Sequence, residues 1–187
     1  MPGVRSKRGP VQLIIFALVM LVGLPATADT KVTTVLDNVR PKAVADGDTH
    51  TIDLRFQGID SPEKNQLCEH VNGTCYECGQ EAKKALLSII TYKRGNRTKW
   101  HVLDIKIWTV GKYGRPVVTA YLNGKVVHKM MSKRGWAVAY RQYLPEELKA
   151  DYLAAEAEAK AAKRGIWQGN FITPSKWRQG ERLTCEN

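Results

Sequence analysis

The chain has 187 residues with 29 lysines and arginines against 18 aspartates and glutamates, which gives a formal net charge of +11. This length suits a single domain with a hydrophobic core and excludes an assembly of several full-sized domains. The basic balance excludes an acidic, solvating polypeptide and favours a polyanionic partner such as nucleic acid, a phospholipid surface or acidic polysaccharide.

Residues 1–28 have the pattern of a secretory signal peptide. Three basic residues precede an apolar run at residues 11–24, and Ala26-Thr27-Ala28 supplies the small residues of a cleavage site. The run is short and polar residues follow it at once, which favours a cleaved signal over an uncleaved membrane anchor. Cleavage there leaves residues 29–187 as one exported domain of charge +8, periplasmic or secreted and without stable membrane association.

Short strands are expected at the start of this domain. Residues 32–56 are rich in Val, Thr and Ile with turn residues between them, which indicates two or three strands. Residues 58–62 are expected to leave the sheet as a loop, and residues 63–76 to form an exposed excursion held by cysteines. Apolar side chains at helical spacing predict an amphipathic helix over residues 79–92, with Arg94-Gly95-Asn96 as its stop.

A second group of strands follows this helix. They are expected at residues 100–108 and 116–122, with a break between them at Gly111-Lys112-Tyr113-Gly114. The second strand runs into Asn123-Gly124, a pair typical of a two-residue hairpin turn. The pattern is therefore that of a β-meander into which helices are inserted.

Two more helices are expected in the C-terminal third. Residues 126–133 predict a short helix that Gly135 stops, and residues 145–164 predict a longer one. One face of the longer helix is expected to pack in the core through Leu148, Tyr152, Ala155 and Ala159. Residues 168–187 show no periodicity and are expected to wrap the surface as a tail. These strands and helices define an α+β fold, of which a five-stranded barrel with an inserted and a capping helix is one form.

The four cysteines are expected to form two disulfides, because an exported protein enters an oxidising compartment. They are Cys68, Cys75, Cys78 and Cys185. Three pairings are possible, and a pairing of Cys185 with any of the other three would tie the tail to the body of the domain. A zinc site is the disfavoured alternative, since neither a second Cys-x-x-Cys pair nor a suitably spaced histidine accompanies Cys75 and Cys78.

Acidic residues gather in one short stretch of the chain. Asp46-Gly47-Asp48-Thr49 is followed by Arg55 and then by Asp60-Ser61-Pro62-Glu63. Four carboxylates repel one another, and a divalent cation with oxygen ligands is a simple counter-charge. Such a cation and an arginine can hold a phosphate oxygen between them while a spare carboxylate takes a proton. Taken alone, the first of these stretches is also typical of a plain turn.

Five stretches in this order resemble the thermonuclease (staphylococcal nuclease) family from about residue 35 to residue 167. They are Asp46-Gly47-Asp48-Thr49; Arg55 with Gly58-Ile59-Asp60-Ser61-Pro62-Glu63; Gly79-Gln80-Glu81-Ala82; Tyr113-Gly114-Arg115; and Gly135-Trp136-Ala137 leading to Ala155-Glu156 and Gly165-Ile166-Trp167. The resemblance implies a five-stranded OB-fold barrel with about three helices. It also implies a monomeric, calcium-dependent enzyme that hydrolyses phosphodiester bonds of DNA and RNA and leaves 3′-phosphate products.

The same resemblance implies a role for nine residues. The calcium ligands would be Asp48, Asp60 and Ser61, the last through its main-chain carbonyl, where the family usually has threonine. The catalytic residues would be Arg55 and Arg115, which hold the phosphate, and Glu63, the general base. Contacts to the terminal phosphate, sugar or base of the substrate would come from Lys112, Tyr113 and Tyr140. Tyr140 is equally compatible with a place in the core.

Two departures from the family pattern leave alternatives open. Only six residues separate Asp48 from Arg55, whereas the family usually has a longer hairpin there, and a slip of one residue would turn Arg55 to the opposite face of the sheet. Gly111 stands where the family often has aspartate. One alternative is therefore a nucleic-acid-binding module of the same fold with weakened catalysis. Another is a basic envelope-associated protein that uses the fold for protein or lipid contacts.

Overall fold

The structure, a computed structural model, describes residues 34–39, 53–111 and 115–186. All of them belong to one compact unit, Lys31–Asn187. The predicted signal peptide, the stretch from Asp46 to Thr49, and Lys112 and Tyr113 lie outside the described residues. No helix among the described residues is both long enough and apolar enough to cross a membrane.

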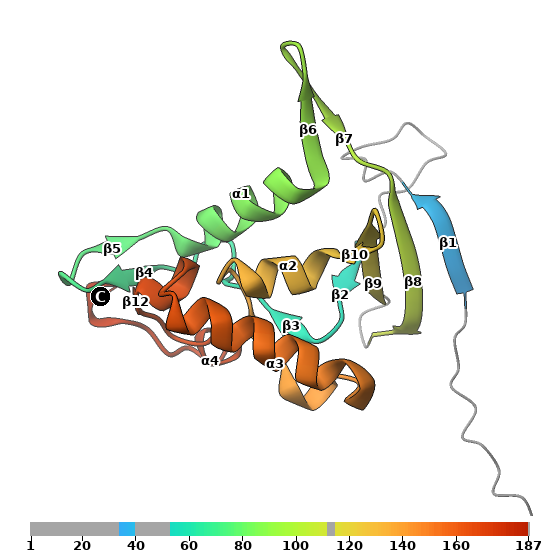
Figure 1. The fold of residues 1–187 in the computed structure, drawn as a ribbon. Coiled ribbons are helices and arrows are strands. Elements are labelled where there is room, and N and C mark those ends of the chain that lie inside the picture. The colour runs from blue at the N-terminus through green and yellow to red at the C-terminus, as the bar shows by residue number, and fades with distance from the viewer. Residues whose placement is uncertain (1–33, 40–52, 112–114, 187) are drawn as a thin grey trace, which may run out of the picture. The chain divides into compact units, whose positions relative to one another are not determined.

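The largest sheet contains five strands (Figure 1). Its centre is the antiparallel pair β8 (Leu103–Val110) and β9 (Pro116–Leu122). Strand β1 (Thr34–Val39) lies beside β8, and β10 (Lys125–Val126) lies beside β9. Strand β2 (Arg55–Phe56) also pairs with β9 and is parallel to it, with Arg55 opposite Val117 and Phe56 opposite Val118.

Two smaller sheets join segments that are far apart in the sequence. Strand β3 (Ile59–Asp60) pairs with β11 (Val138–Ala139). Strand β4 (Cys68–His70) lies between β5 (Cys75–Tyr76) and β12 (Gly169–Asn170) of the tail. The C-terminal tail is therefore part of a sheet, whereas its lack of periodicity had predicted only a surface segment.

A two-stranded hairpin follows the first helix. It is formed by β6 (Thr91–Arg94) and β7 (Arg97–Trp100), and Gly95 at its tip has a positive φ of 61°. The prediction that Arg94-Gly95-Asn96 only stops the helix was therefore incomplete. A Gly-Asn pair serves equally well as a two-residue hairpin turn, and the strands on either side decide between the two outcomes.

Four α-helices are present in the described residues, against the three predicted. They are α1 (Cys78–Ile90), α2 (Val127–Lys133), α3 (Glu146–Ala161) and α4 (Pro174–Arg178), with short 3-10 segments at Arg141–Tyr143, Gly165–Gln168 and Thr184–Glu186. The first three match predicted helices, and α4 of the tail was not predicted. Helix α2 packs against α1, α3 and β9, so it links the helices to the main sheet (Figure 1).

The main hydrophobic core lies between the sheet and helices α2 and α3. Its buried members include Ile105, Val118, Ala120, Val127, Met131 and Tyr152. The predicted inner face of α3 is confirmed, since Tyr152, Ala155 and Ala159 are buried and Leu148 packs partly against the core. The α+β class is confirmed as well, whereas the described strands do not close into a barrel.

The disulfides are Cys68–Cys78 and Cys75–Cys185, so the four cysteines are all paired and none is available for zinc. The first bond closes the segment between β4 and α1. The second joins β5 to the last residues of the chain, 110 positions away in sequence. The Cys75–Cys185 bond therefore ties the tail to the body. The observed pairing is one of the three that the sequence left open.

Candidate active site

The two described carboxylates of the predicted site lie at the end of β3 and just beyond it. Asp60 is the last residue of β3, pairs with Val138 of β11, and has a side chain that is only 8% exposed. Glu63 lies three residues further on, and its side chain is 38% exposed. Residues 59 and 60 were predicted to be a loop. That prediction was wrong because the partner strand β11 comes from a distant part of the chain.

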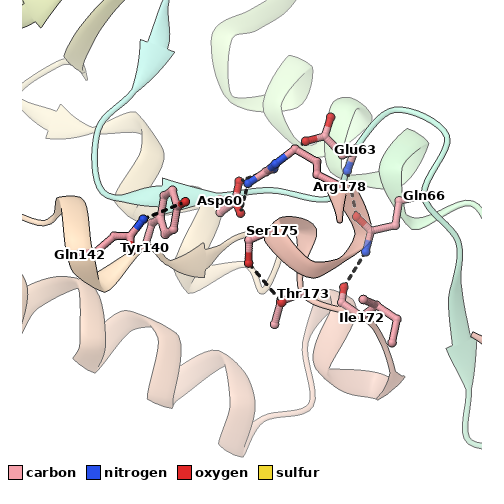
Figure 2. A network of polar contacts seen from close by, with 9 residues as sticks. All are labelled: Asp60, Glu63, Gln66, Tyr140, Gln142, Ile172, Thr173, Ser175 and Arg178. Atoms are coloured by element: carbon pink, nitrogen blue, oxygen red, sulfur yellow. Dashed lines mark hydrogen bonds and ion pairs between the residues drawn. The ribbon is translucent and has the colours of Figure 1, made fainter. Parts of the chain in front are cut away.

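Gln66 fixes the loop that carries Glu63 (Figure 2). Its side-chain oxygen accepts a hydrogen bond from the Glu63 backbone N–H (3.1 Å), and its backbone N–H donates to the Glu63 carbonyl (2.8 Å). Its side-chain nitrogen donates to the carbonyl of Ile172 in the tail (2.6 Å). With an exposed fraction of 1%, Gln66 satisfies its polar atoms inside the protein and joins the carboxylate loop to the tail.

Helix α1 approaches the same loop very closely at Gly79. The Gly79 backbone N–H donates to the Gln66 carbonyl (3.1 Å), and a Cβ at this position would overlap the carbonyl oxygen of Glu63. Only glycine allows the two backbones to lie this near. The start of α1 therefore supports the main chain from which the Glu63 side chain projects.

Arg178 of α4 is the residue of this site that the sequence did not predict (Figure 2). Its two terminal nitrogens donate to the two oxygens of Asp60, at 3.0 and 2.9 Å, and one of them also donates to Glu63 (2.7 Å). The hydrogen bonds to Asp60, followed by that to Glu63, raise the pKa of Arg178 above its already high value. The contact spans 118 positions in the sequence, so no local pattern could have indicated it.

The two predicted arginines reach the same place from the main sheet. Arg55 of β2 pairs with Val117 of β9, and Arg115 lies two residues before Val117. Both arginines line the same two cavities. The hairpin before Arg55 lies mostly outside the described residues, so the effect of its length stays a prediction. The Gly111 N–H donates a hydrogen bond to the Arg115 carbonyl (2.8 Å).

One cavity of about 370 Å³ collects these side chains. Its lining includes Arg55, Asp60, Ser61, Glu63, Arg115 and Arg178. Five of the nine residues to which the family resemblance gave a role therefore line one cavity, together with the unpredicted arginine. Of the remaining four, Asp48, Lys112 and Tyr113 lie outside the described residues.

The ninth residue, Tyr140, lines a neighbouring cavity of about 360 Å³. This cavity shares Arg55 and Arg115 with the first one, and its wall also contains Tyr143. The Arg55 guanidinium carbon lies 6.0 Å from the centre of the Tyr140 ring, and Tyr143 packs edge-on against that ring at 4.8 Å. An aromatic face therefore stands next to the two arginines.

Glu156 of α3 supports the segment that carries Tyr140. Its carboxylate accepts a hydrogen bond from the backbone N–H of Ala139 in β11 (2.8 Å) and is paired with Arg141 at 3.4 Å. The Glu156 side chain is 13% exposed, so these contacts are partly shielded from water. They bracket Tyr140 on both sides along the chain. A third cavity, of about 600 Å³, lies between α3 and the tail and shares Asp60 and Tyr140 with the other two.

The oxygen atoms at the end of β3 fit part of a site for a hard divalent cation. Both Asp60 oxygens and one Glu63 oxygen converge on a single cation, the Arg178 guanidinium, so this position already attracts positive charge. Calcium prefers carboxylate and carbonyl oxygens, and Ser61 could add its carbonyl. Among the described residues, no group of three or more His, Cys, Asp or Glu side chains could hold a metal ion. A cation at this position would therefore need further oxygen ligands.

Comparison with known proteins gives the same family that the residues indicated. Residues 53–169 match the family described as staphylococcal nuclease homologue. The chain belongs to the staphylococcal nuclease family.

Three relatives illustrate the similarity. An uncharacterized endonuclease of Haemophilus influenzae is 30% identical over 151 residues, which are 75% of this chain and 72% of that protein. A micrococcal nuclease of Shigella flexneri is 26% identical over 190 residues, 95% of this chain and 97% of that protein. The staphylococcal-like nuclease CAN1 of Arabidopsis thaliana is 32% identical over 130 residues, 69% of this chain and 34% of the plant protein.

Proposed function

We propose that this chain is an exported, calcium-dependent nuclease that hydrolyses phosphodiester bonds of DNA and RNA and leaves 3′-phosphate products. The observation that carries this proposal is the single cavity lined by Arg55, Arg115, Asp60 and Glu63. It combines donors for a phosphate with carboxylates for a cation and a proton. Membership of the family supports it, and the mixed sheet would then be part of the OB-fold barrel.

The two arginines would bind the phosphate that is cleaved. Both arginines line the cavity, and among the described residues neither forms an ion pair. The planar guanidinium forks match phosphate oxygens and stabilise the charge that builds there as phosphorus becomes five-coordinate. The neighbouring ring of Tyr140 would offer a stacking face to a base of any identity, which suits an enzyme without sequence preference.

Glu63 would act as the general base. Its loop is held by Gln66 and by the close approach of Gly79, so the carboxylate projects from a fixed main chain. Water would add to phosphorus while its proton passes to Glu63, and the bond between phosphorus and the 5′ oxygen would break as that oxygen takes a proton from solvent water. A bound calcium ion would supply further positive charge to the phosphate. Asp60, the carbonyl of Ser61 and Asp48 would hold that ion.

Export and a monomeric state are part of the same proposal. Residues 1–28 would be removed as a signal peptide, and residues 29–187 would form one domain with its tail in the periplasm or the medium. Two disulfides in the described residues support passage through an oxidising compartment.

One observation favours the alternative of a nucleic-acid-binding module with weakened catalysis. Arg178 occupies both oxygens of Asp60 and one oxygen of Glu63, the groups that the reaction would need for the cation and the proton. A permanent contact of this kind would leave the arginines to bind phosphate without cleavage.

A calcium titration of cleavage separates the two functions. The chain is expressed with its signal, recovered after export, and assayed on single-stranded DNA and on RNA. We expect cleavage that rises with calcium and a loss of about a hundredfold or more in Glu63→Gln, with Glu147→Gln on the exposed start of α3 as the matched control. Nucleic-acid binding that is indifferent to calcium and to Glu63→Gln, without cleavage, would establish the binding module instead.

A further inference from the structure

The C-terminal tail carries a positive charge into the place that the proposed cation would occupy. The Arg178 guanidinium makes a two-pronged contact with Asp60 and a third hydrogen bond with Glu63 (Figure 2). A carboxylate has about four lone-pair sites, and the two that face Arg178 are taken. A divalent cation that approached Asp60 from this side would meet a like charge at hydrogen-bonding range, where repulsion is strong.

The segment that carries Arg178 is anchored on both sides. Before it, the Ile172 carbonyl accepts a hydrogen bond from the buried Gln66 (2.6 Å), which is also bound to the Glu63 loop. After it, Cys185 is bonded to Cys75 of β5. The guanidinium therefore does not belong to a free chain end, and its local concentration at the carboxylates is high.

Contacts within the tail keep the segment folded between these anchors. The Arg182 guanidinium lies 4.0 Å from the centre of the Trp177 ring and donates to the Trp177 carbonyl (2.7 Å). The Trp177 ring nitrogen donates to Glu186 (3.1 Å). Helix α4 begins with Pro174, which is buried and fits the first turn. Arg178 thus projects toward the carboxylates from a small folded unit.

We propose that Arg178 is a tethered competitor of the divalent cation, which holds Asp60 and Glu63 in the metal-free protein and must leave Asp60 for the cation to bind. This rests on the proposed function, because it takes the end of β3 as the cation site. The competition lowers the apparent cation affinity by the fraction of molecules in which Arg178 is displaced. If the contact is closed in about nine molecules of ten, the loss is about tenfold. Arg178 would thereby set the calcium concentration at which the site fills.

The test measures calcium binding without nucleic acid, by isothermal titration calorimetry on the exported chain with both disulfides formed. Arg178→Gln is compared with the wild type and with Lys176→Gln, which removes a charge from an exposed position of the same helix and does not contact Asp60 or Glu63. We expect the calcium dissociation constant to fall about tenfold in Arg178→Gln and to stay unchanged in Lys176→Gln. An unchanged or weaker affinity in Arg178→Gln overturns the proposal, because Arg178 would then support the carboxylates rather than compete for them.

A second measurement uses the wild type, so it does not depend on how the variant folds. The side-chain nitrogen signals of Arg178 are followed by NMR during a calcium titration. We expect the hindered guanidinium of the metal-free protein to become freely rotating as calcium saturates the site, while the Arg182 signals stay in place. Hindered Arg178 signals at saturating calcium contradict the proposal.

The two proposals can fail separately. If the wild type binds no calcium, the calcium claim of the proposed function fails. If the wild type binds calcium and the Arg178 signals do not change, only the proposed competition fails.

Discussion

Three arginines line one cavity, but they are in opposite situations. Arg178 comes from the tail and gives its donors to Asp60 and Glu63, whereas Arg55 and Arg115 come from the sheet and form no ion pair with a described residue. Three of the five Arg178 donors are used by these carboxylates, whereas Arg55 and Arg115 are placed to bind a phosphate. The comparison separates a carboxylate half of the site, governed by the tail, from an arginine half, governed by the β2–β9 pairing.

The largest predicted effect lies in the arginine half. Arg55→Ala removes one phosphate donor from the cavity, and we expect the rate of DNA cleavage to fall about a hundredfold to a thousandfold. Arg55→Lys should recover only part of this loss, because an ammonium group cannot make the two-pronged contact. The measurement is the cleavage rate at saturating calcium, with Lys125→Ala at an exposed position of β10 as control. A loss of less than fivefold would show that Arg55 does not contact the reacting phosphate.

In the carboxylate half, the largest expected effect comes from a substitution that displaces the main chain at Glu63. Gly79→Ala places a methyl group against the Glu63 carbonyl, so helix α1 and the loop must separate. We expect a loss of about 1–3 kcal/mol in the free energy of unfolding and a clear loss of cleavage. Denaturant unfolding and the cleavage rate measure the two effects. Lys83→Ala, at an exposed position of the same helix, should change neither; an unchanged stability of Gly79→Ala would refute the close approach.

Acid should weaken the arginine half through His128. Burial lowers the pKa of His128 to about 3, and the ring, which is stacked near Phe56 at 5.2 Å, has no hydrogen-bond partner among the described residues. The folded state therefore binds fewer protons than the unfolded state, in which the pKa is about 6.5. The contribution of the neutral His128 ring to the free energy of unfolding is therefore complete above pH 6.5 and is lost as the pH falls toward 3.

Between pH 7 and pH 5 this difference amounts to about 2 kcal/mol of unfolding free energy. Phe56 follows Arg55 in β2. We therefore expect the position of Arg55 to become less fixed when His128 is protonated. Denaturant unfolding at both pH values tests the effect. His128→Phe should flatten the pH dependence in this range, and an equally steep dependence in that variant would assign it to other groups.

The smallest predicted effect concerns the basic β6–β7 hairpin, which follows α1 (Figure 1). The hairpin carries Lys93, Arg94, Arg97 and Lys99 and no acidic residue. We expect the double variant Arg94→Gln, Arg97→Gln to slow cleavage of long single strands about two- to fivefold at low salt and to leave dinucleotide cleavage unchanged. The control pair is Lys125→Gln, Lys163→Gln. An equal loss on dinucleotides would place the hairpin in the catalytic site instead of in substrate attraction.

Local signals explain what the sequence predicted correctly. Helices α1, α2 and α3 have apolar residues at helical spacing, and the Asn123-Gly124 turn has the positive φ values that such a pair adopts easily. Arg55, Asp60 and Glu63 could be found because they lie within nine positions of one another. The structure brings them together with Arg115 as the family resemblance implied, and their roles remain predictions.

Contacts between distant segments explain what the sequence missed. Strand β3 exists only because β11 supplies its hydrogen-bonding partner, and Arg178 becomes part of the site only because β12 and the Cys75–Cys185 disulfide fold the tail back. Gln66 gave no signal either, since a glutamine in a polar loop is ordinary until its loop is buried. The disulfide was the single available clue to the position of the tail, and three pairings were open.

Two parameters of one experiment test the division of the site most directly. The maximal rate of DNA cleavage and the calcium concentration at half-maximal rate are measured for the wild type, Arg115→Ala and Arg178→Gln. We predict that Arg115→Ala lowers the maximal rate and leaves the calcium midpoint unchanged, whereas Arg178→Gln lowers the midpoint and leaves the maximal rate within a few fold. If Arg115→Ala and Arg178→Gln both change the maximal rate, or both change the calcium midpoint, in the same direction, the separation of the two halves is contradicted.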